Sequence, residues 1–144
     1  MKMASEKLSE SEMWEKIRVD KGIVKKSLSL AERDIKTAKN VFEDKDYDWS
    51  LAIAYNAMLQ AGRALMFSEG YRPKGKYKHV AVIEFVKSRF KEFAEQTLFT
   101  FNKTRKKRHI AVYEQVDIVS KEEARNVLNW AEKFVNKAKE ILEE

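Results

Sequence analysis

Residues 104–114, TRKKRHIAVYE, hold the side chains of this sequence that are best suited to chemistry. A helix turns by about 100° per residue, which places four of them within about 140° of one another: Arg105, Arg108, His109 and Tyr113. Arginine offers phosphate a bidentate fork, and histidine exchanges protons near neutral pH. The pattern therefore predicts a phosphate or RNA site on one face of a helix.

This helix face is otherwise apolar, because Leu98, Phe101 and Val112 share it with Arg105, whereas Lys107 points the other way. Burying an unpaired charge there would cost several kcal/mol, so the charged groups need a carboxylate, a solvent cleft or a bound anion. Two interpretations follow. The arginines and the histidine pair with acids on neighbouring helices, or they bind phosphate.

The element that would position these groups is the stretch 49–70, which is apolar almost all the way round at 3.6 residues per turn. Such a helix must be covered on most sides and is expected at the centre of a bundle. Its middle carries one polar seam, formed by Asn56, Gln60 and Arg63. These side chains either satisfy one another or helix ends, or they line a cleft that faces Arg108.

The remaining elements are also predicted to be helical. Serine followed three residues later by glutamate, the capping-box spacing, predicts three helix starts: Ser9 with Glu12, Ser29 with Glu32, and Ser120 with Glu123. We expect the first helix to be short and to end near Gly22, and the central helix to have Asp48 as N-cap and Gly70 at C′. Apolar spacing adds a fourth helix through residues 80–93 and a fifth over about 96–112.

No segment alternates convincingly enough for a strand, and the single proline and four glycines leave little room for the turns of an all-β fold. The sequence predicts an all-α fold: one domain over residues 1–144, an up-and-down antiparallel bundle of five to six helices. Within it, residues 1–27 form an N-terminal extension with a short helix, and residues 28–142 form the core.

The composition excludes several classes of protein. With 44% hydrophobic and 36% charged residues the chain is too apolar for disorder, and without cysteine it has neither disulfides nor thiolate zinc sites. The N-terminus lacks a continuous apolar core, and no run approaches the roughly 18 apolar residues of a membrane helix. We therefore expect a soluble cytoplasmic protein with no membrane association.

Positive charge is concentrated in one third of the chain. Residues 71–109 carry 12 Lys or Arg against 3 Glu, within a net charge of +6. His79 lies there in a basic cluster with Lys78. The two histidines of the chain have no clustered carboxylate, so no metal and no cofactor is expected. The basic third is either a solvated face or a footprint for RNA or for an acidic protein.

The segment DYDWSLAIAYNAMLQAGRALMFSEGYRPKGKYKHVAVIEF resembles the signature region of small prokaryotic HEPN-domain proteins. The matching positions run from a tyrosine helix that ends in Arg-Ala-Leu, through a glycine and a basic loop, to a histidine: Tyr55, Ala57, Met58, Ala61, Arg63, Ala64, Leu65, Gly70, Lys78 and His79. Arg108 through Tyr113 resembles the family's Arg motif, and EEARNVLNWAEKFV its last helix. The resemblance covers roughly residues 28 to 140.

The resemblance implies a helical bundle that is often a homodimer with its cleft at the dimer interface. Many HEPN proteins are metal-independent ribonucleases, frequently toxins neutralised by a partner minimal nucleotidyltransferase. In the family's motif a histidine follows the arginine by several residues. Here Arg108 is followed by His109, and Tyr113 stands where the later histidine is expected. Alternatively, Arg105 pairs with His109 at a spacing one residue too short.

By this resemblance the catalytic residues would be Arg108, His109 and Tyr113. The arginine would stabilise the phosphorane, His109 would move a proton, and Tyr113 would position the phosphate or be modified by the nucleotidyltransferase. RNA phosphates would be bound by the remaining polar groups: Arg63, Lys78, His79, Arg105, Asn56 and Gln60. The alternative is a non-catalytic module or scaffold that binds RNA, a nucleotide or the nucleotidyltransferase.

Overall fold

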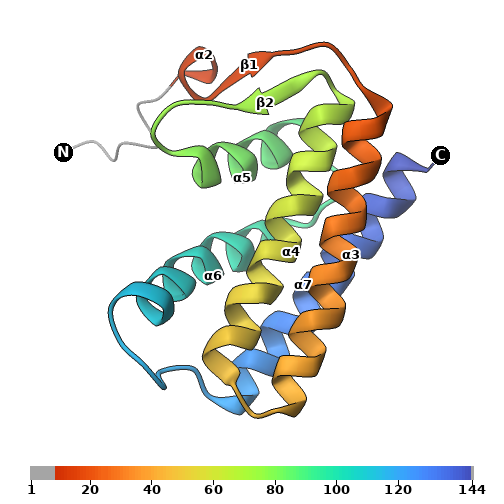
Figure 1. Cartoon of the computed structure of the whole chain (residues 1–144). Helices are drawn as coiled ribbons and strands as arrows, with labels where there is room; N and C mark the ends of the chain where they lie inside the picture. The colour runs from red at the N-terminus through yellow and green to blue at the C-terminus, as the bar shows by residue number, and fades with distance from the viewer. Residues whose placement is uncertain (1–8, 144) are drawn as a thin grey trace.

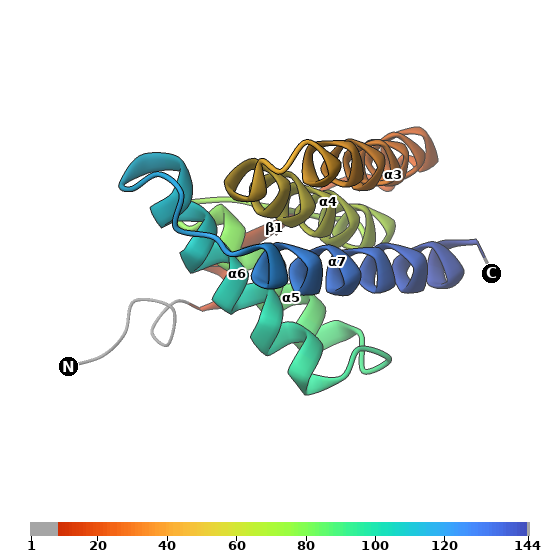
Figure 2. The ribbon, with the colours of Figure 1, turned by 90° about the horizontal axis from the view of Figure 1, so that it is seen from below.

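A computed structural model describes residues 9–143 and shows a helical bundle with a small two-stranded sheet at one end (Figure 1). Three long helices lie side by side: α3 (Lys21–Glu43), α4 (Tyr47–Ser68) and α7 (Lys121–Leu142). The helices α5 (Lys78–Arg89) and α6 (Glu95–Tyr113) lie across them on one side of α4 (Figure 2). The short elements α2 (Glu10–Met13), β1 (Trp14–Lys16) and β2 (Tyr71–Pro73) close the end near the start of α3. The prediction of an all-α bundle of five to six helices is confirmed.

Helix α4 is the central element, as its sequence predicts. It contacts α3, α5, α6, α7 and β2, and its large side chains Leu51, Tyr55, Met58, Leu65 and Met66 are fully buried. The helix runs antiparallel to α3 and in the same direction as α7 (Figure 1). It approaches α5 closely at Gly62, where an added Cβ would lie 2.5 Å from Cγ1 of Val82. A side chain at position 62 would therefore push α5 away from α4.

The first segment differs from its prediction. The capping box at Ser9 and Glu12 is present, but the helix it starts lasts only four residues. Trp14–Lys16 then pairs antiparallel with Tyr71–Pro73, because Trp14 is buried edge-to-face against Phe85 of α5. The expected continuation toward Gly22 is therefore wrong, as is the expected absence of strands. Strands of three residues are too short to show alternation.

Two other predicted helix starts are corrected. Ser29 lies inside α3, which begins at Lys21 with the Asp20 carboxylate accepting hydrogen bonds from the Gly22 and Ile23 N–H groups. Helix α3 therefore passes without a break through the expected boundary at residues 27 and 28. Helix α4 is capped by Asp46, not Asp48. The Asp48 carboxylate instead accepts hydrogen bonds from the N–H groups of Asp117 and Val119, at 2.7 and 3.0 Å, and ties the α6–α7 loop to the start of α4.

Other local signals match the structure. Ser120 Oγ accepts from the Glu123 N–H at 3.0 Å and starts α7, and Gly70 follows α4 with φ of +80°. The expected fifth helix corresponds to α6. The fourth, α5, ends at Arg89, so Phe90 and Phe93 are buried from the connection rather than from the helix. None of the helices between residues 9 and 143 has the length and apolarity needed to cross a membrane.

Candidate functional site

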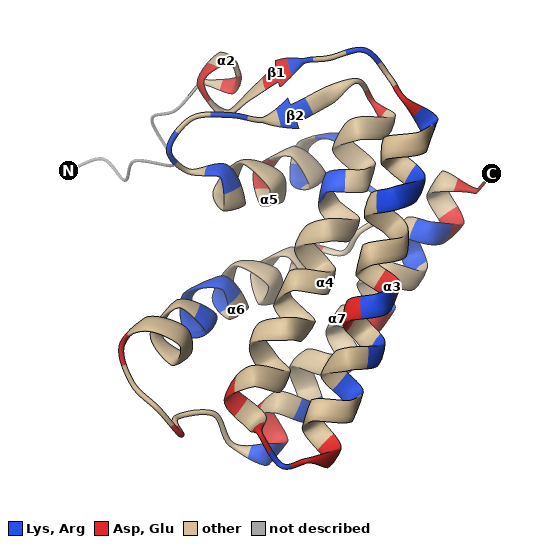
Figure 3. Cartoon of the chain, in the orientation of Figure 1, with Lys and Arg blue, Asp and Glu red and all other residues tan. Residues whose placement is uncertain are grey.

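Three arginines from two helices gather around one buried tyrosine. Arg108 of α6 places its guanidinium carbon 6.0 Å from the ring centroid of Tyr55 on α4. The charges of Arg63 on α4 and Arg105 on α6 act on the same tyrosine. Arg63 and Arg108 therefore lie on the same side of the bundle, as a shared cleft requires. Figure 3 shows the basic outer part of α6 and the basic β2–α5 connection on this side of α4.

Tyr55 is joined to a histidine from a third helix. Its hydroxyl lies 3.1 Å from Nδ1 of His79, which stands in the first turn of α5. Phe101 of α6 packs edge-to-face on the Tyr55 ring, with centroids 5.6 Å apart. Helices α4, α5 and α6 thus meet at one phenol–imidazole pair, which we call the Tyr55–His79 pair.

No carboxylate neutralises these arginines in the part of the chain that the structure describes. Arg63 and Arg108 have no ion pair there, and the Arg105 Nε donates only to the neutral amide oxygen of Asn102, at 3.1 Å. The Nε of Arg108 is buried without a hydrogen-bond partner. The interpretation that neighbouring acids satisfy the arginines is therefore wrong for the described residues.

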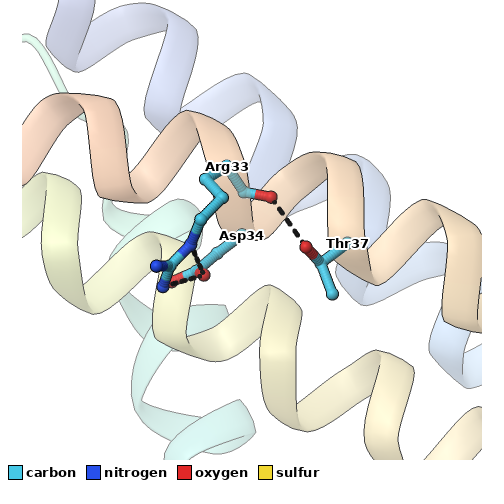
Figure 4. A network of polar contacts seen from close by, with 3 residues as sticks. All are labelled: Arg33, Asp34 and Thr37. Carbon is cyan, nitrogen blue, oxygen red and sulfur yellow. Dashed lines mark hydrogen bonds and ion pairs between the residues drawn. The ribbon is translucent and has the colours of Figure 1, made fainter.

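Helix α3 shows what a satisfied arginine looks like in this protein (Figure 4). Both Nε and Nη2 of Arg33 donate to one oxygen of the buried Asp34, at 3.2 and 2.9 Å. The neighbouring Thr37 hydroxyl donates to the Arg33 carbonyl. The arginines near Tyr55 have no such carboxylate, so they retain donors for a ligand.

The electrostatics follow from burial and from this excess of positive charge. Burial and, to a smaller extent, the charges of Arg63, Arg108 and Arg105 in that order together lower the pKa of His79 from 6.5 to about 4. Burial also raises the pKa of Tyr55 well above its ordinary value, against the opposing effect of the three arginines. It lowers the pKa of Arg63. At neutral pH the Tyr55–His79 pair is uncharged and lies in a strongly positive field.

The other expected site residues lie toward the surface. His109 is exposed, with Nε2 3.5 Å from a carboxylate oxygen of Glu114, so its expected place in the apolar stripe is wrong. Its ring packs against that of the exposed Tyr113, with centroids 5.1 Å apart and planes tilted by 45°, and the Arg108 guanidinium carbon lies 5.8 Å from the Tyr113 ring centroid. Tyr113 therefore connects His109 to the arginines. Lys78 is exposed beside His79.

Asn56 and Gln60 are half-buried on α4. Neither makes a side-chain hydrogen bond to any residue between 9 and 143, so the interpretation that they satisfy one another is wrong. They share the half-exposed stripe of α4 with Arg63 and are free to bind a ligand or a partner.

A groove of about 690 Å³ lies away from the arginines, between α6 and α7, and is lined by Phe99, Lys103 and Trp130 among others. Lys107, which points away from the arginines as predicted, crosses to α7 and pairs with Glu123 at 3.3 Å. Charge in this groove is thus partly neutralised, whereas the charge around Tyr55 is not. The unneutralised charge therefore makes the arginines around Tyr55, and not this groove, the candidate site for an anion. Within residues 9–143, no three of the His, Asp and Glu side chains gather closely enough to hold a metal ion.

Comparison with known proteins gives the family. The family model of the HEPN domain matches residues 24–141, which include Tyr55, His79 and the three arginines near them. The chain belongs to the HEPN family. The tyrosine of α4, the histidine of α5 and the arginines of α6 are thus parts of a HEPN domain.

Two relatives come from Methanocaldococcus jannaschii. "Putative toxin MJ0605" is 32% identical over 122 residues, which are 81% of this chain and 87% of that protein. "Putative toxin MJ0142" is 26% identical over 122 residues, 83% of this chain and 81% of that protein.

Two solved structures share the fold. TT1696 from Thermus thermophilus has a TM-score of 0.66 at 15% identity and covers 81% of this chain and 96% of its own. The archaeal HEPN homologue ST0689 has a TM-score of 0.65 at 17% identity, with 83% and 97% covered.

The sequence did not single out Tyr55 as a member of this HEPN site. Tyr55 stood in the apolar stripe of the central helix, and the resemblance marked it without a chemical role. A hydroxyl in a stripe of otherwise apolar side chains is a usable signal, because a buried phenol needs a hydrogen-bond partner. Nothing in the spacing indicates that the partner is His79, 24 residues away.

Acid is expected to destabilise the fold through His79. The unfolded chain binds a proton at this imidazole below pH 6.5, whereas the folded protein stays neutral there down to about pH 4. Stability is therefore fully present above pH 6.5 and lost between these values, by about 1–2 kcal/mol after allowance for the half-exposed ring. Urea unfolding near pH 7 and near pH 4.5 measures the loss. His79→Gln should show a smaller acid loss by that amount, and an equal loss in both proteins would contradict the expectation.

Proposed function

We propose that this HEPN protein binds RNA phosphates at the arginines around the Tyr55–His79 pair and cleaves RNA without a metal ion, as the toxin of a toxin–antitoxin system. The observation that carries the proposal is the gathering of Arg63, Arg105 and Arg108 with no carboxylate between them. Donors without a protein acceptor match phosphate oxygens, and arginine binds them bidentately. The names of the two Methanocaldococcus relatives support the assignment as a toxin.

Cleavage would use proton transfer and charge stabilisation. The ribose 2′-OH attacks the adjacent phosphorus, the bond to the 5′-oxygen breaks, and one proton leaves the 2′-OH while another reaches the 5′-oxygen. His109 would move a proton, the arginines would stabilise the phosphorane, and Tyr113 would position the phosphate. The ring contact between His109 and Tyr113 and the position of the Arg108 guanidinium over the Tyr113 ring support this division of roles. Lys78, Asn56 and Gln60 would extend the contact along the RNA.

The test is incubation of the purified protein with structured RNA in EDTA, beside Arg105→Ala and His109→Ala. Cleavage by the wild type that both variants lose supports the proposal. Equal products from all three samples, or none, would remove the enzymatic claim.

The exposure of His109 and its contact with Glu114 favour a second candidate, a module that binds RNA or a partner nucleotidyltransferase without cleaving. RNA binding without cleavage products, with an affinity that falls steeply as the salt concentration rises, would support an RNA-binding module. Co-purification of a stoichiometric protein partner without nucleic acid would support a module that binds a nucleotidyltransferase.

We also propose that two copies pair through α4. Every half-exposed or exposed residue from position 49 to 67 follows one seam with spacing of four and three: Trp49, Ile53, Asn56, Gln60, Arg63 and Phe67. This is the spacing of a helix that packs against another helix. Because Arg63 belongs to the seam, pairing would bring the arginines of both copies to one cleft.

A charge in the middle of this seam is expected to separate the copies. Asn56→Arg should weaken the dimer at least tenfold, since like charges would meet across a two-fold axis beside Arg63. Light scattering after size-exclusion chromatography at micromolar concentration measures the mass. Asn129→Arg, on the exposed face of α7, is the matched control and should leave the mass unchanged. A monomeric wild type, or a dimer that tolerates Asn56→Arg, would contradict the pairing.

A further inference from the structure

The direction of the hydrogen bond between Tyr55 and His79 can be derived from the surroundings of the phenol. Tyr55 is fully buried, and Nδ1 of His79 is the hydrogen-bond partner of its hydroxyl among the described residues. A buried hydroxyl proton that finds no acceptor costs about 1–3 kcal/mol. The nearby charged groups are guanidiniums, which have donors and no acceptor. The phenol proton must therefore go to Nδ1.

This direction decides which nitrogen of His79 carries the ring proton. The imidazole is neutral at physiological pH, because burial and three arginines hold its pKa near 4. A neutral imidazole has one N–H, and Nδ1 is occupied as an acceptor. The proton is thus on Nε2. Nε2 has no hydrogen-bond partner between residues 9 and 143, and the half-buried ring leaves it accessible to a ligand.

We propose that Tyr55 holds neutral His79 in the tautomer with its proton on Nε2, so that His79 is a fourth hydrogen-bond donor, beside the three arginines, to a fully ionised phosphate group. Tyr55 is then a positioning residue, and His79 contacts the ligand without accepting a proton from it. The inference rests on the phosphate site of the proposed function. It adds to that function a preference of the site for fully ionised phosphate groups, whose free oxygens all accept hydrogen bonds.

The ligand class follows from the lack of an acceptor. A protonated oxygen of the phosphate held by the three arginines and His79 Nε2 would face only donors from these four groups, and its own O–H would find no acceptor among them. A phosphate monoester loses its second proton near pH 6, so only above this pH do all its free oxygens match the site. The negatively charged oxygens of a phosphorane are also acceptors, and a neutral imidazole can stabilise them by donating a hydrogen bond.

Nitrogen-15 NMR of the imidazoles tests the tautomer directly in the free protein. The chain has two histidines, so His109→Asn assigns the His79 signals. We expect a protonated Nε2 and an acceptor-type Nδ1 at pH 7, with this preference weakened in Tyr55→Phe. A protonated Nδ1 in the wild type, or an imidazolium at pH 7, would overturn the proposal.

Binding of uridine 3′-monophosphate, measured by calorimetry, tests the donor role. Glutamine can place an N–H near the position of Nε2, whereas the shorter asparagine cannot. We expect His79→Asn and Tyr55→Phe to weaken binding by about five- to tenfold and His79→Gln to stay within about twofold. Tyr71→Phe on β2 is the control for loss of a phenol, and thermal unfolding checks that each variant is folded. Equal losses in His79→Gln and His79→Asn would overturn the donor role.

The pH dependence separates a neutral donor from an imidazolium. Wild-type affinity should rise from about pH 5 to about pH 7 as the monoester ionises, whereas a protonated His79 would make it fall. The NMR and binding measurements do not need RNA cleavage. If the protein does not cleave RNA but the NMR and binding results are as expected, the ribonuclease proposal fails and the donor role of His79 stands. If the protein cleaves RNA but Nδ1 of His79 is protonated, the donor role fails and the ribonuclease proposal stands.

Discussion

Replacing Arg108 with alanine is expected to lower RNA cleavage by about 10²- to 10³-fold while changing the free energy of unfolding by no more than about 1–2 kcal/mol. The loss of activity is that typical of removing one donor from a site that stabilises an oxyanion. The guanidinium carbon lies 6.0 Å from the ring centroid of Tyr55 and 5.8 Å from that of Tyr113, and the guanidinium has no carboxylate partner among the described residues, so it is available to a phosphate.

The expected effect on stability is small, because one loss and one gain of similar size oppose each other. Removal of Arg108 loses two cation–π contacts, worth about 0.5–1 kcal/mol each when partly exposed. It also removes a buried Nε that has no acceptor, which relieves about 1–3 kcal/mol. The net change therefore lies between a loss of about 1 kcal/mol and a gain of about 2 kcal/mol in the free energy of unfolding. Sites that bind ligands commonly carry such a stability cost.

The measurement pairs an RNA cleavage assay in EDTA with thermal unfolding. Arg125→Ala is the matched control, because Arg125 lies on α7 with its guanidinium 5.6 Å from the Phe42 ring centroid, away from the site. It should retain activity. A fall of Tm by several degrees in Arg108→Ala would show that the arginine serves the fold, and retained cleavage would exclude it from the site.

Replacing Phe101 with alanine is expected to destabilise the protein by about 3–5 kcal/mol, the usual cost of emptying a fully buried phenylalanine site. Phe101 is fully buried and packs edge-to-face on Tyr55 of α4 and on Phe134 of α7, with centroids 5.6 and 5.2 Å apart. It therefore attaches α6 to both long helices. Its loss would also release one side of the Tyr55 ring, so RNA binding should weaken in whatever fraction remains folded.

Urea unfolding measures this loss, and α6 supplies its own control. Phe99 stands two residues earlier and is 67% exposed, so Phe99→Ala should change stability by no more than about 0.5 kcal/mol. Similar effects at both positions would show that α6 is not attached to the bundle through Phe101.

The local part of the fold was predictable from the sequence. The apolar circumference of residues 49–70, the end of the central helix before Gly70 and the Ser120 cap depend on neighbours within one or two helical turns. The structure confirms all of them. The errors occurred where a side chain serves a distant element. Trp14 packs on α5 and draws its segment into a strand, and Asp48 holds the loop before α7 instead of capping α4.

The same division applies to the site. The sequence by itself determined the fold class, the basic segment of α6 and the presence of Arg105 and Arg108 on one face of a helix, because helical periodicity orders residues a few positions apart. Only the tertiary structure decided that Arg63 shares their side of the bundle, that His109 is exposed, and that Tyr55 meets His79. The physical reason is that the crossing of α4, α5 and α6 sets these contacts. That crossing depends on core packing, such as the close approach at Gly62, which spacing along one helix does not encode.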